Sequence, residues 1–287
     1  MRFKPACPNA APLRCCALLL SLAAAGPAPA FEDPHTWAQL LYNEHRVGRP
    51  QPVITAIDPG LDMMDAYRIQ SRYVALAGGE AAVGGFKAGL TSPVARYRFR
   101  VDRPLAGVLF NAGRRAPAAE IRRAEYPGLR IECELGFTLN RAVDLPLADT
   151  AELARLLASV APVVELPRVN FDGDGPPRAV DLVAGNVGSA LYIVGRSFSI
   201  GDPAYLDTEF VQLYRDGKVV DRGKATNVMG AQLEALLWLV NHTVARGITV
   251  QPGQLLLTGA MGAMVPAEPG DYRAEFRSGG VIPFTVR

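Results

Sequence analysis

Two glutamates interrupt an apolar segment of strand character, RIECELGFTL at residues 130–139, and this segment constrains the fold more than any other. In a β-strand, residues two positions apart project from the same face. Glu132 and Glu134 therefore point the same way, while Cys133 and its apolar neighbours face the opposite, packed side. Like charges held this close repel, so the fold must place a cation or a basic side chain beside them.

Two interpretations of the pair remain open. In the first, the strand is a solvated sheet edge, and Arg130 neutralises the acids in a surface ion pair. In the second, the acids bind a metal ion together with Glu165, a lone carboxylate in the apolar run APVVELPRV, where burial of an unpaired charge is costly. Three carboxylates favour Mg²⁺ or Mn²⁺, and zinc is disfavoured because no His or Cys cluster accompanies them.

A basic residue is also expected near such a site. Three carboxylates and a divalent ion leave a net negative charge, so an anionic substrate would need a further cation. Lys87, in the Gly-flanked segment GGFKAGLTS, is the candidate because a lysine in a strand of low polarity is costly. The alternative is an ordinary lysine whose ammonium group reaches solvent.

The N-terminus has the pattern of a secretory signal peptide. Arg2, Lys4 and Arg14 flank or precede the apolar run CCALLLSLAAA, and small residues follow it at 28–30. We expect residues 1–30 to be removed, leaving a periplasmic protein with no stable membrane span. An uncleaved N-terminal anchor is the alternative.

Charge and cysteine content exclude some classes of partner and site. The chain has 30 Lys and Arg against 28 Asp and Glu, and loss of the signal peptide leaves 27 against 28. A net charge of −1 argues against a nucleic-acid partner. The mature chain keeps only Cys133, which therefore has no partner for an internal disulfide and is predicted to be a core residue. A nucleophilic cysteine is the alternative, without a supporting motif.

Helical periodicity dominates the start of the mature chain. Apolar residues recur at helical spacing within 34–48 and 60–79, which predicts two helices. These residues are Trp37, Leu40, Leu41, Leu61, Met64, Ile69 and Tyr73. We expect a helical N-terminal region, residues 31–82, that packs on the rest of the chain.

From Val83 onward the pattern changes to short β-rich runs bounded by Gly, Pro and Asp. Two helices interrupt them, near 151–160 and 231–246, and Asp216-Gly217 predicts a tight hairpin. The sequence thus predicts an α+β protein whose β-rich core occupies residues 83–287.

Six segments together resemble the 2-keto-4-pentenoate hydratase branch of the fumarylacetoacetate hydrolase superfamily. They occur in order from about residue 36 to the end: DAYRIQ, GGFKAGLTS, VDRPLAGVLF, IECELGF, PVVELP and GAQLEALLWLVNHTVARGITVQPGQLLLTGAMGAMVPAEPGD. The resemblance implies a mixed β-roll core of the fumarylacetoacetase C-terminal type with a smaller helical N-terminal part. It also implies a homo-oligomer.

The resemblance assigns roles to residues of this chain. It implies that Glu132, Glu134 and Glu165 hold Mg²⁺ or Mn²⁺. The residues expected to bind a 2-oxo acid substrate are Lys87, Asn186, Ser189, Thr258 and Gly259. Water would add to C4 of a 2-hydroxydienoate or 2-oxo-enoate acid, with Lys87 and Glu134 as catalytic residues.

The chain departs from the family pattern near this site. Leu105 stands where family hydratases usually carry Asp, Gly185 stands where an Asp usually precedes Asn186, and Ala231-Gln232 replaces a frequent Asn-Pro. Asp102 is the candidate to take over proton transfer, although a turn role before Arg103-Pro104 is favoured. Export is also unusual in a family that normally works on cytoplasmic aromatic breakdown products.

An exported, metal-dependent hydratase is therefore the leading interpretation. The same metal site could instead serve an acylpyruvate-type hydrolase or a 2-oxo acid decarboxylase by stabilising an enolate. Hydrolysis ranks lower, because no His-Glu pair accompanies the metal candidates. A third alternative is a periplasmic binding protein without turnover, which Leu105, Gly185 and the export signal motivate.

Overall fold

The computed structural model describes residues 33–173, 175–199 and 201–287. The predicted signal peptide lies outside the described residues. The described residues belong to a single compact unit. Within the described ranges, no helix is both long enough and apolar enough to cross a membrane.

Helices occupy both the start of the chain and positions between strands. The α-helices of the described residues are α1 Pro34–Arg46, α2 Ile54–Ile57, α3 Met63–Leu76, α4 Pro93–Phe99, α5 Thr150–Leu156, α6 Ala179–Ala184 and α7 Gln232–Ala245. Asp33, Asp62, Ser92 and Asp149 cap the first turns of α1, α3, α4 and α5 through side-chain acceptors.

The strands of the described residues are mostly short. They are β1 Gln51–Pro52, β2 Val83–Gly89, β3 Leu105–Phe110, β4 Arg114–Arg115, β5 Glu120–Ile121, β6 Arg130–Leu139, β7 Leu157–Leu166, β8 Phe171–Asp172, β9 Leu191–Val194, β10 Phe210–Arg215, β11 Lys218–Lys224, β12 Leu255–Leu257, β13 Val265–Pro266, β14 Gly270–Phe276 and β15 Val281–Val286.

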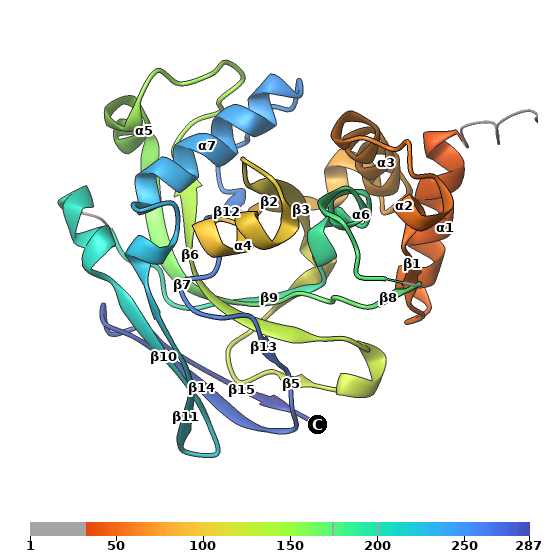
Figure 1. Ribbon diagram of the computed structural model, residues 1–287. Coiled ribbons are helices and arrows are strands. Elements are labelled where there is room, and N and C mark those ends of the chain that lie inside the picture. The colour runs from red at the N-terminus through yellow and green to blue at the C-terminus, as the bar shows by residue number, and fades with distance from the viewer. Residues whose placement is uncertain (1–32, 174, 200) are drawn as a thin grey trace, which may run out of the picture. The chain divides into compact units, whose positions relative to one another are not determined.

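An eight-stranded mixed sheet forms the centre of the molecule (Figure 1). Its order is β3-β2-β12-β6-β7-β9-β4, with β13 paired to β6 off this path. β12 runs parallel to β2 and antiparallel to β6, so strands far apart in sequence become neighbours. A five-stranded sheet, β11-β10-β14-β15-β5, packs near it, and β1 pairs with β8. The curled, mixed sheet with helices confirms the predicted α+β fold.

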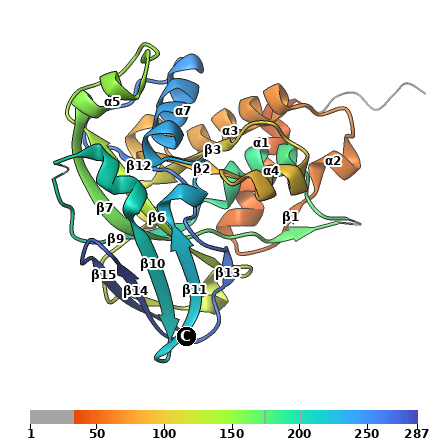
Figure 2. The same cartoon turned by 60° about the vertical axis from the view of Figure 1, so that its left-hand side comes forward.

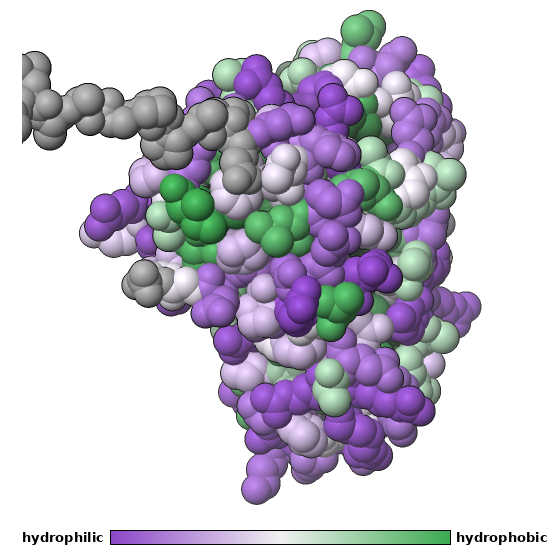
Figure 3. Space-filling view, turned by 90° about the vertical axis from the view of Figure 1, so that its right-hand side faces the viewer, coloured by the Kyte–Doolittle hydropathy of each residue, from purple (hydrophilic) through white to green (hydrophobic). Residues whose placement is uncertain are grey.

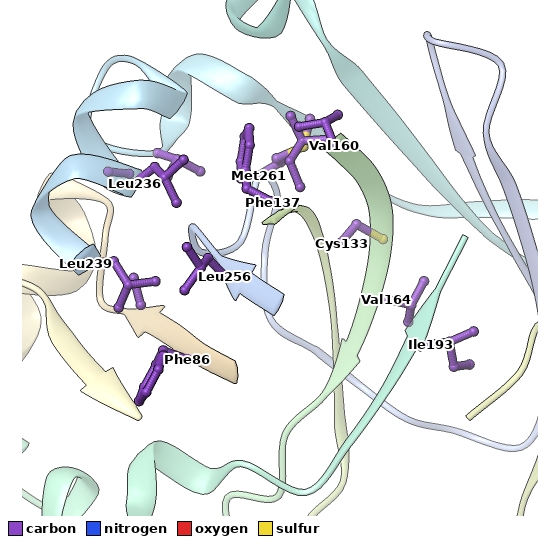
Figure 4. Close-up of a cluster of buried hydrophobic side chains, with 14 of the residues drawn as sticks. Phe86, Cys133, Phe137, Val160, Val164, Ile193, Leu236, Leu239, Leu256 and Met261 are labelled. Atoms are coloured by element: carbon purple, nitrogen blue, oxygen red, sulfur yellow. The ribbon is translucent and has the colours of Figure 1, made fainter. Parts of the chain in front are cut away.

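The main hydrophobic core lies on one face of this sheet, against α7 and the five-stranded sheet, and Figure 4 shows part of it. Leu236 and Leu239 of α7 pack over Phe86 and Leu256 of the sheet, and all four are almost fully buried. Cys133 is 1% exposed and belongs to the same cluster. This confirms Cys133 as a core residue, and burial raises the pKa of its thiol, which opposes a nucleophilic role.

The N-terminal helices form a second cluster with α6 and Leu105. Figure 2 shows α1, α2 and α3 grouped on one side of the sheet, and Figure 3 shows that their outer face is mostly hydrophilic with separate hydrophobic residues. A hydrogen bond connects this cluster to the sheet: the Gln70 side chain of α3 donates to the Ala106 carbonyl of β3 at 2.8 Å. The predicted helices are confirmed, although Leu40 and Met64 are 37% and 59% exposed.

Two local predictions need correction. The helix expected near 151–160 ends at Leu156, and residues 157–160 begin β7 instead. The physical reason is pairing with β6, which extends to Leu157 and outweighs the local helical preference. Helices α2, α4 and α6 were not predicted. The hairpin at Asp216-Gly217 is confirmed, since it joins β10 to β11.

Candidate metal centre

The register between β6 and β7 brings the three predicted acids together. The two strands are antiparallel, and Glu132 lies directly opposite Glu165. Glu134 follows two residues later on the same face of β6. Facing residues on neighbouring strands have side chains within contact distance. Carboxylate oxygens from Glu132, Glu134 and Glu165 accordingly lie within 4.8 Å of one another.

This cluster lies inside the protein. β6 lies between β12 and β7, so it is an interior strand of the large sheet. Glu134 is 1% exposed and Glu165 is 0% exposed. The alternative of a solvated sheet edge neutralised by Arg130 is therefore wrong, because strand pairing on both sides removes the edge.

Lys87 contacts the cluster from β2. Its ammonium group donates to Glu165 in an ion pair and to the Val187 carbonyl at 3.1 Å. The Lys87 side chain is buried, so the alternative of a solvated lysine is wrong. Burial by itself lowers the pKa of Lys87, but Glu165, Glu132 and Glu134 together outweigh it and raise that pKa. Lys87 is therefore a charged ammonium group in this site.

Burial raises the pKa of all three carboxylates, and repulsion from neighbouring carboxylates raises it further for Glu132 and Glu134. Burial is the largest influence, and the Glu165 charge adds to it, so the pKa of Glu132 rises to about 7. The pKa of Glu134 rises well above its usual range for the same two reasons and because Glu132 is near. For Glu165, burial raises the pKa although Lys87 lowers it in part. The single ammonium group of Lys87 thus compensates only part of the negative charge of the cluster.

The carboxylate oxygens left over fit a divalent cation. Glu134 Oε2 accepts a hydrogen bond from the Gly259 N–H at 2.9 Å, and Lys87 contacts Glu165 Oε1. The other oxygens, Glu134 Oε1 and Glu165 Oε2, are buried and have no hydrogen-bond partner among the described residues. Such orphaned acceptors are costly unless a cation binds them. A divalent ion would also neutralise the two carboxylate charges that Lys87 leaves uncompensated, and an all-oxygen set suits Mg²⁺ or Mn²⁺.

The loop after β12 supplies the N–H that holds Glu134. Gly259 has φ +110°, and a Cβ there would lie 2.2 Å from Thr91 Oγ1. Only glycine fits this conformation and this space. The neighbouring Thr258 hydroxyl donates to Gln232 Oε1 at 2.6 Å. The structure thus places the predicted Thr258 and Gly259 beside the acids. The sequence marked Gln232 only as part of a departure from a frequent Asn-Pro and gave it no role in the site.

The loop between α6 and β9 passes over Lys87. Its Asn186 is 0% exposed, and its carboxamide pairs with both backbone groups of Val108, at 2.8 and 2.9 Å. Asn186 therefore anchors the loop to β3 with its side chain. Ser189 is buried in the same loop. Substrate binding by Asn186 and Ser189 stays a prediction.

The structure shows what surrounds each residue that departs from the family pattern. A Cβ on Gly185 would lie 2.7 Å from Gln51 Oε1, so the Gln51 side chain occupies the space that a larger residue would need. Leu105 is 2% exposed and packs into the N-terminal cluster from the face of β3 that carries Gly107, the partner of Lys87. Asp102 is exposed in the turn before β3. Its catalytic role stays a prediction.

Comparisons with known proteins agree with this arrangement. No family model matches the chain. A 2-keto-4-pentenoate hydratase of Paraburkholderia xenovorans (strain LB400) is 33% identical over 240 residues, which cover 82% of this chain and 87% of that protein. A 2-hydroxyhexa-2,4-dienoate hydratase of Comamonas testosteroni is 29% identical over 244 residues, covering 82% and 90%.

Solved structures show the same fold. The 4-oxalocrotonate decarboxylase of Pseudomonas putida G7, complexed with magnesium and adipate, superposes with a TM-score of 0.82. The alignment covers 88% of this chain and 97% of that chain at 23% identity. The same decarboxylase complexed with calcium and acetate gives a TM-score of 0.81. From its sequence relatives, the chain belongs to the 2-keto-4-pentenoate hydratase family, a family of hydro-lyases.

Proposed function

We propose that this chain is a Mg²⁺- or Mn²⁺-dependent hydratase that adds water to a short 2-hydroxydienoate or 2-oxo-enoate acid. The observation that carries the proposal is the cluster of half-buried Glu132 with buried Glu134 and Glu165, which has two orphaned oxygens and Lys87 in contact. The names of the sequence relatives support the hydration of a dienoate.

The three glutamates would hold the cation, and Lys87 would keep its positive charge beside it. When bound, the ion supplies Lewis acidity that stabilises negative charge on the C2 oxygen of a 2-oxo acid. The surrounding burial strengthens these electrostatic interactions, because the protein interior screens charge less than water does. The ammonium of Lys87 also favours the carboxylate of an anionic substrate.

Proton transfer falls to a residue that is not a metal ligand. Lys87 is a titratable side chain in contact with the cluster, and it holds a proton at Nζ. Ketonisation of the dienol moves a proton from the C2 hydroxyl to C5. Water then adds its oxygen to C4 and a proton to C3, which gives a 4-hydroxy-2-oxo acid. Because its raised pKa keeps it protonated, Lys87 is suited to donate a proton in either step as a general acid.

The test follows the ultraviolet absorbance of 2-hydroxypenta-2,4-dienoate with the purified chain from residue 31 onward. We expect the absorbance to decay only with Mg²⁺ or Mn²⁺, and the product to be a 4-hydroxy-2-oxo acid. Release of carbon dioxide from an oxalocrotonate-like substrate, without hydration, would reassign the reaction to decarboxylation. Full activity in the presence of a chelator would refute the metal requirement.

We also propose that the protein is exported and works as a homo-oligomer. The support for export is the charged, apolar and small-residue pattern of residues 1–30. N-terminal sequencing of the protein from a periplasmic fraction should begin near residue 31. Light scattering of the purified protein should give a mass above the monomer's. Retention of the N-terminus in the cytoplasm, or a monomeric mass, would contradict the respective proposal.

A further inference from the structure

Gln232 is a buried polar residue at the start of α7, and its hydrogen bonds point to the metal centre. It is 0% exposed. Its backbone N–H donates to Asp207 Oδ1 at 2.8 Å, which caps a helix whose N-cap, Ala231, offers no side-chain acceptor. Its side-chain Nε2 donates to the Ala225 carbonyl at 2.9 Å. The amide orientation is thereby set, so Oε1 is the acceptor that faces Thr258.

Thr258 connects Gln232 to the acidic cluster. The Thr258 hydroxyl donates to Gln232 Oε1 at 2.6 Å. The next residue, Gly259, donates its N–H to Glu134 Oε2 at 2.9 Å. Because one peptide unit joins Thr258 to Gly259, anchoring the Thr258 side chain restricts where the Gly259 N–H points. Glu134 Oε1 is then the oxygen left without a partner among the described residues.

We infer that Gln232 is a positioning residue for the metal centre: through Thr258 it fixes the Gly259 N–H, which orients the Glu134 carboxylate so that Oε1 faces the cation. The inference rests on the proposed function, because it needs the three glutamates to bind a divalent ion. Partners that orient a ligand contribute strongly to metal affinity, and their loss typically costs about 10- to 100-fold.

A second acceptor near the Thr258 hydroxyl allows an effect on metal affinity to be distinguished from an effect on protein stability. The Leu135 carbonyl lies 3.2 Å from the Thr258 hydroxyl. Without the Gln232 acceptor, the hydroxyl can turn to Leu135 and remain hydrogen-bonded. The Thr258–Gly259 peptide would then lose its tether to α7 while the buried hydroxyl stays satisfied. Metal affinity should therefore suffer more than the free energy of unfolding.

The experiment measures Mg²⁺ affinity by titration calorimetry on the purified protein, with no substrate present. We expect Gln232→Met, which keeps the side-chain length and removes both amide groups, to weaken Mg²⁺ binding about tenfold. Thr258→Val should weaken it to a similar extent, and the double variant should weaken it no further, because both act through one contact. Thr258→Ser, which keeps the hydroxyl, should bind Mg²⁺ like the unaltered protein.

Gln70→Met is the matched control. Gln70 is also 0% exposed and also donates to backbone carbonyls, of Ala106 and Val183. Its removal should lower thermal stability by an amount similar to that of Gln232→Met and leave the Mg²⁺ dissociation constant unchanged.

Each outcome bears on the inference. Equal Mg²⁺ affinity in Gln232→Met, Thr258→Val and the unaltered protein would overturn the inference alone. Equal weakening in Gln70→Met would also overturn it, since a general loss of packing would then explain the effect. Absence of divalent-ion binding by the unaltered protein would overturn the proposed function and this inference together. If Gln232→Met does not fold, Thr258→Val and Thr258→Ser decide the matter.

Discussion

Lys87 of β2 and Glu165 of β7 form an ion pair in the interior, with side chains that are 3% and 0% exposed. Strands β12 and β6 lie between β2 and β7 in the sheet. The pair therefore links the two sides of the acidic cluster. Breaking a buried pair leaves one charge uncompensated, which costs far more than breaking a surface pair.

Lys87→Met should therefore destabilise the metal-free protein. We expect a loss of about 3 to 5 kcal/mol in the free energy of unfolding at pH 8, because Glu165 loses its buried ion-pair partner. Added Mg²⁺ should restore part of the loss, because an ion bound to the native state stabilises it. Urea unfolding with and without Mg²⁺ measures both. The control, Lys218→Met on the exposed end of β11, should change stability by less than about 0.5 kcal/mol.

Glu132→Gln should have opposite effects on the metal-free and metal-bound protein. Removing one of three crowded carboxylates relieves repulsion, so the metal-free protein should become more stable at pH 8. Mg²⁺ affinity and hydratase activity should both fall by at least about a hundredfold, since losing a metal ligand weakens binding more than losing a group that orients a ligand. Glu268→Gln, at an exposed ion pair with Arg123, is the control and should leave both unchanged. A Glu132→Gln protein that binds Mg²⁺ normally would remove Glu132 from the ligand set.

The pH dependence should follow the raised pKa of Glu132. In the unfolded chain this group loses its proton near the ordinary value of 4.5, whereas in the metal-free fold it keeps the proton to about 7. The folded state therefore binds more protons between these values, so the free energy of unfolding should fall as the pH rises from about 4.5 to 7.

Mg²⁺ affinity should change in the opposite direction, because the cation competes with these protons. We expect affinity to rise from pH 6 to pH 8 and binding to release protons. Calorimetry in two buffers of different ionisation enthalpy measures the release. A constant affinity across this range would contradict the assignment of protons to the cluster.

Gly259→Ala should be more damaging than an alanine at another left-handed glycine. Its Cβ would meet Thr91 Oγ1 at 2.2 Å, so strain and collision should cost about 3 kcal/mol or more. The shifted N–H should also weaken Mg²⁺ binding. Gly253→Ala is the matched control, since Gly253 has φ +79° with no atom within 4 Å of the added Cβ. It should cost only about 1 to 2 kcal/mol and leave Mg²⁺ binding unchanged. Equal losses in both variants would show that the collision with Thr91 is absent.

Local sequence patterns predicted much of the secondary structure. The helices at the N-terminus and α7 follow from apolar spacing, and Asp216-Gly217 marks the hairpin. The pattern was misleading at residues 157–160, where pairing with β6 turns an expected helix into the start of β7. The spacing of Leu40 and Met64 marked a helix without showing that their side chains are exposed. Periodicity identifies an element, but only its neighbours decide how far it extends and which face is covered.

That Glu132 and Glu134 share a face could be read from the sequence, because it follows from the geometry of one strand. The sequence also identified Glu165 and Lys87 as charged residues in apolar segments. The folded structure was needed to show that Glu165 lies opposite Glu132 and that Lys87 contacts Glu165. It was also needed to show that Gln232 binds Thr258 in the loop beside Glu134. The physical reason is that strand register and helix packing depend on contacts between distant segments, and no local pattern records which segments will meet.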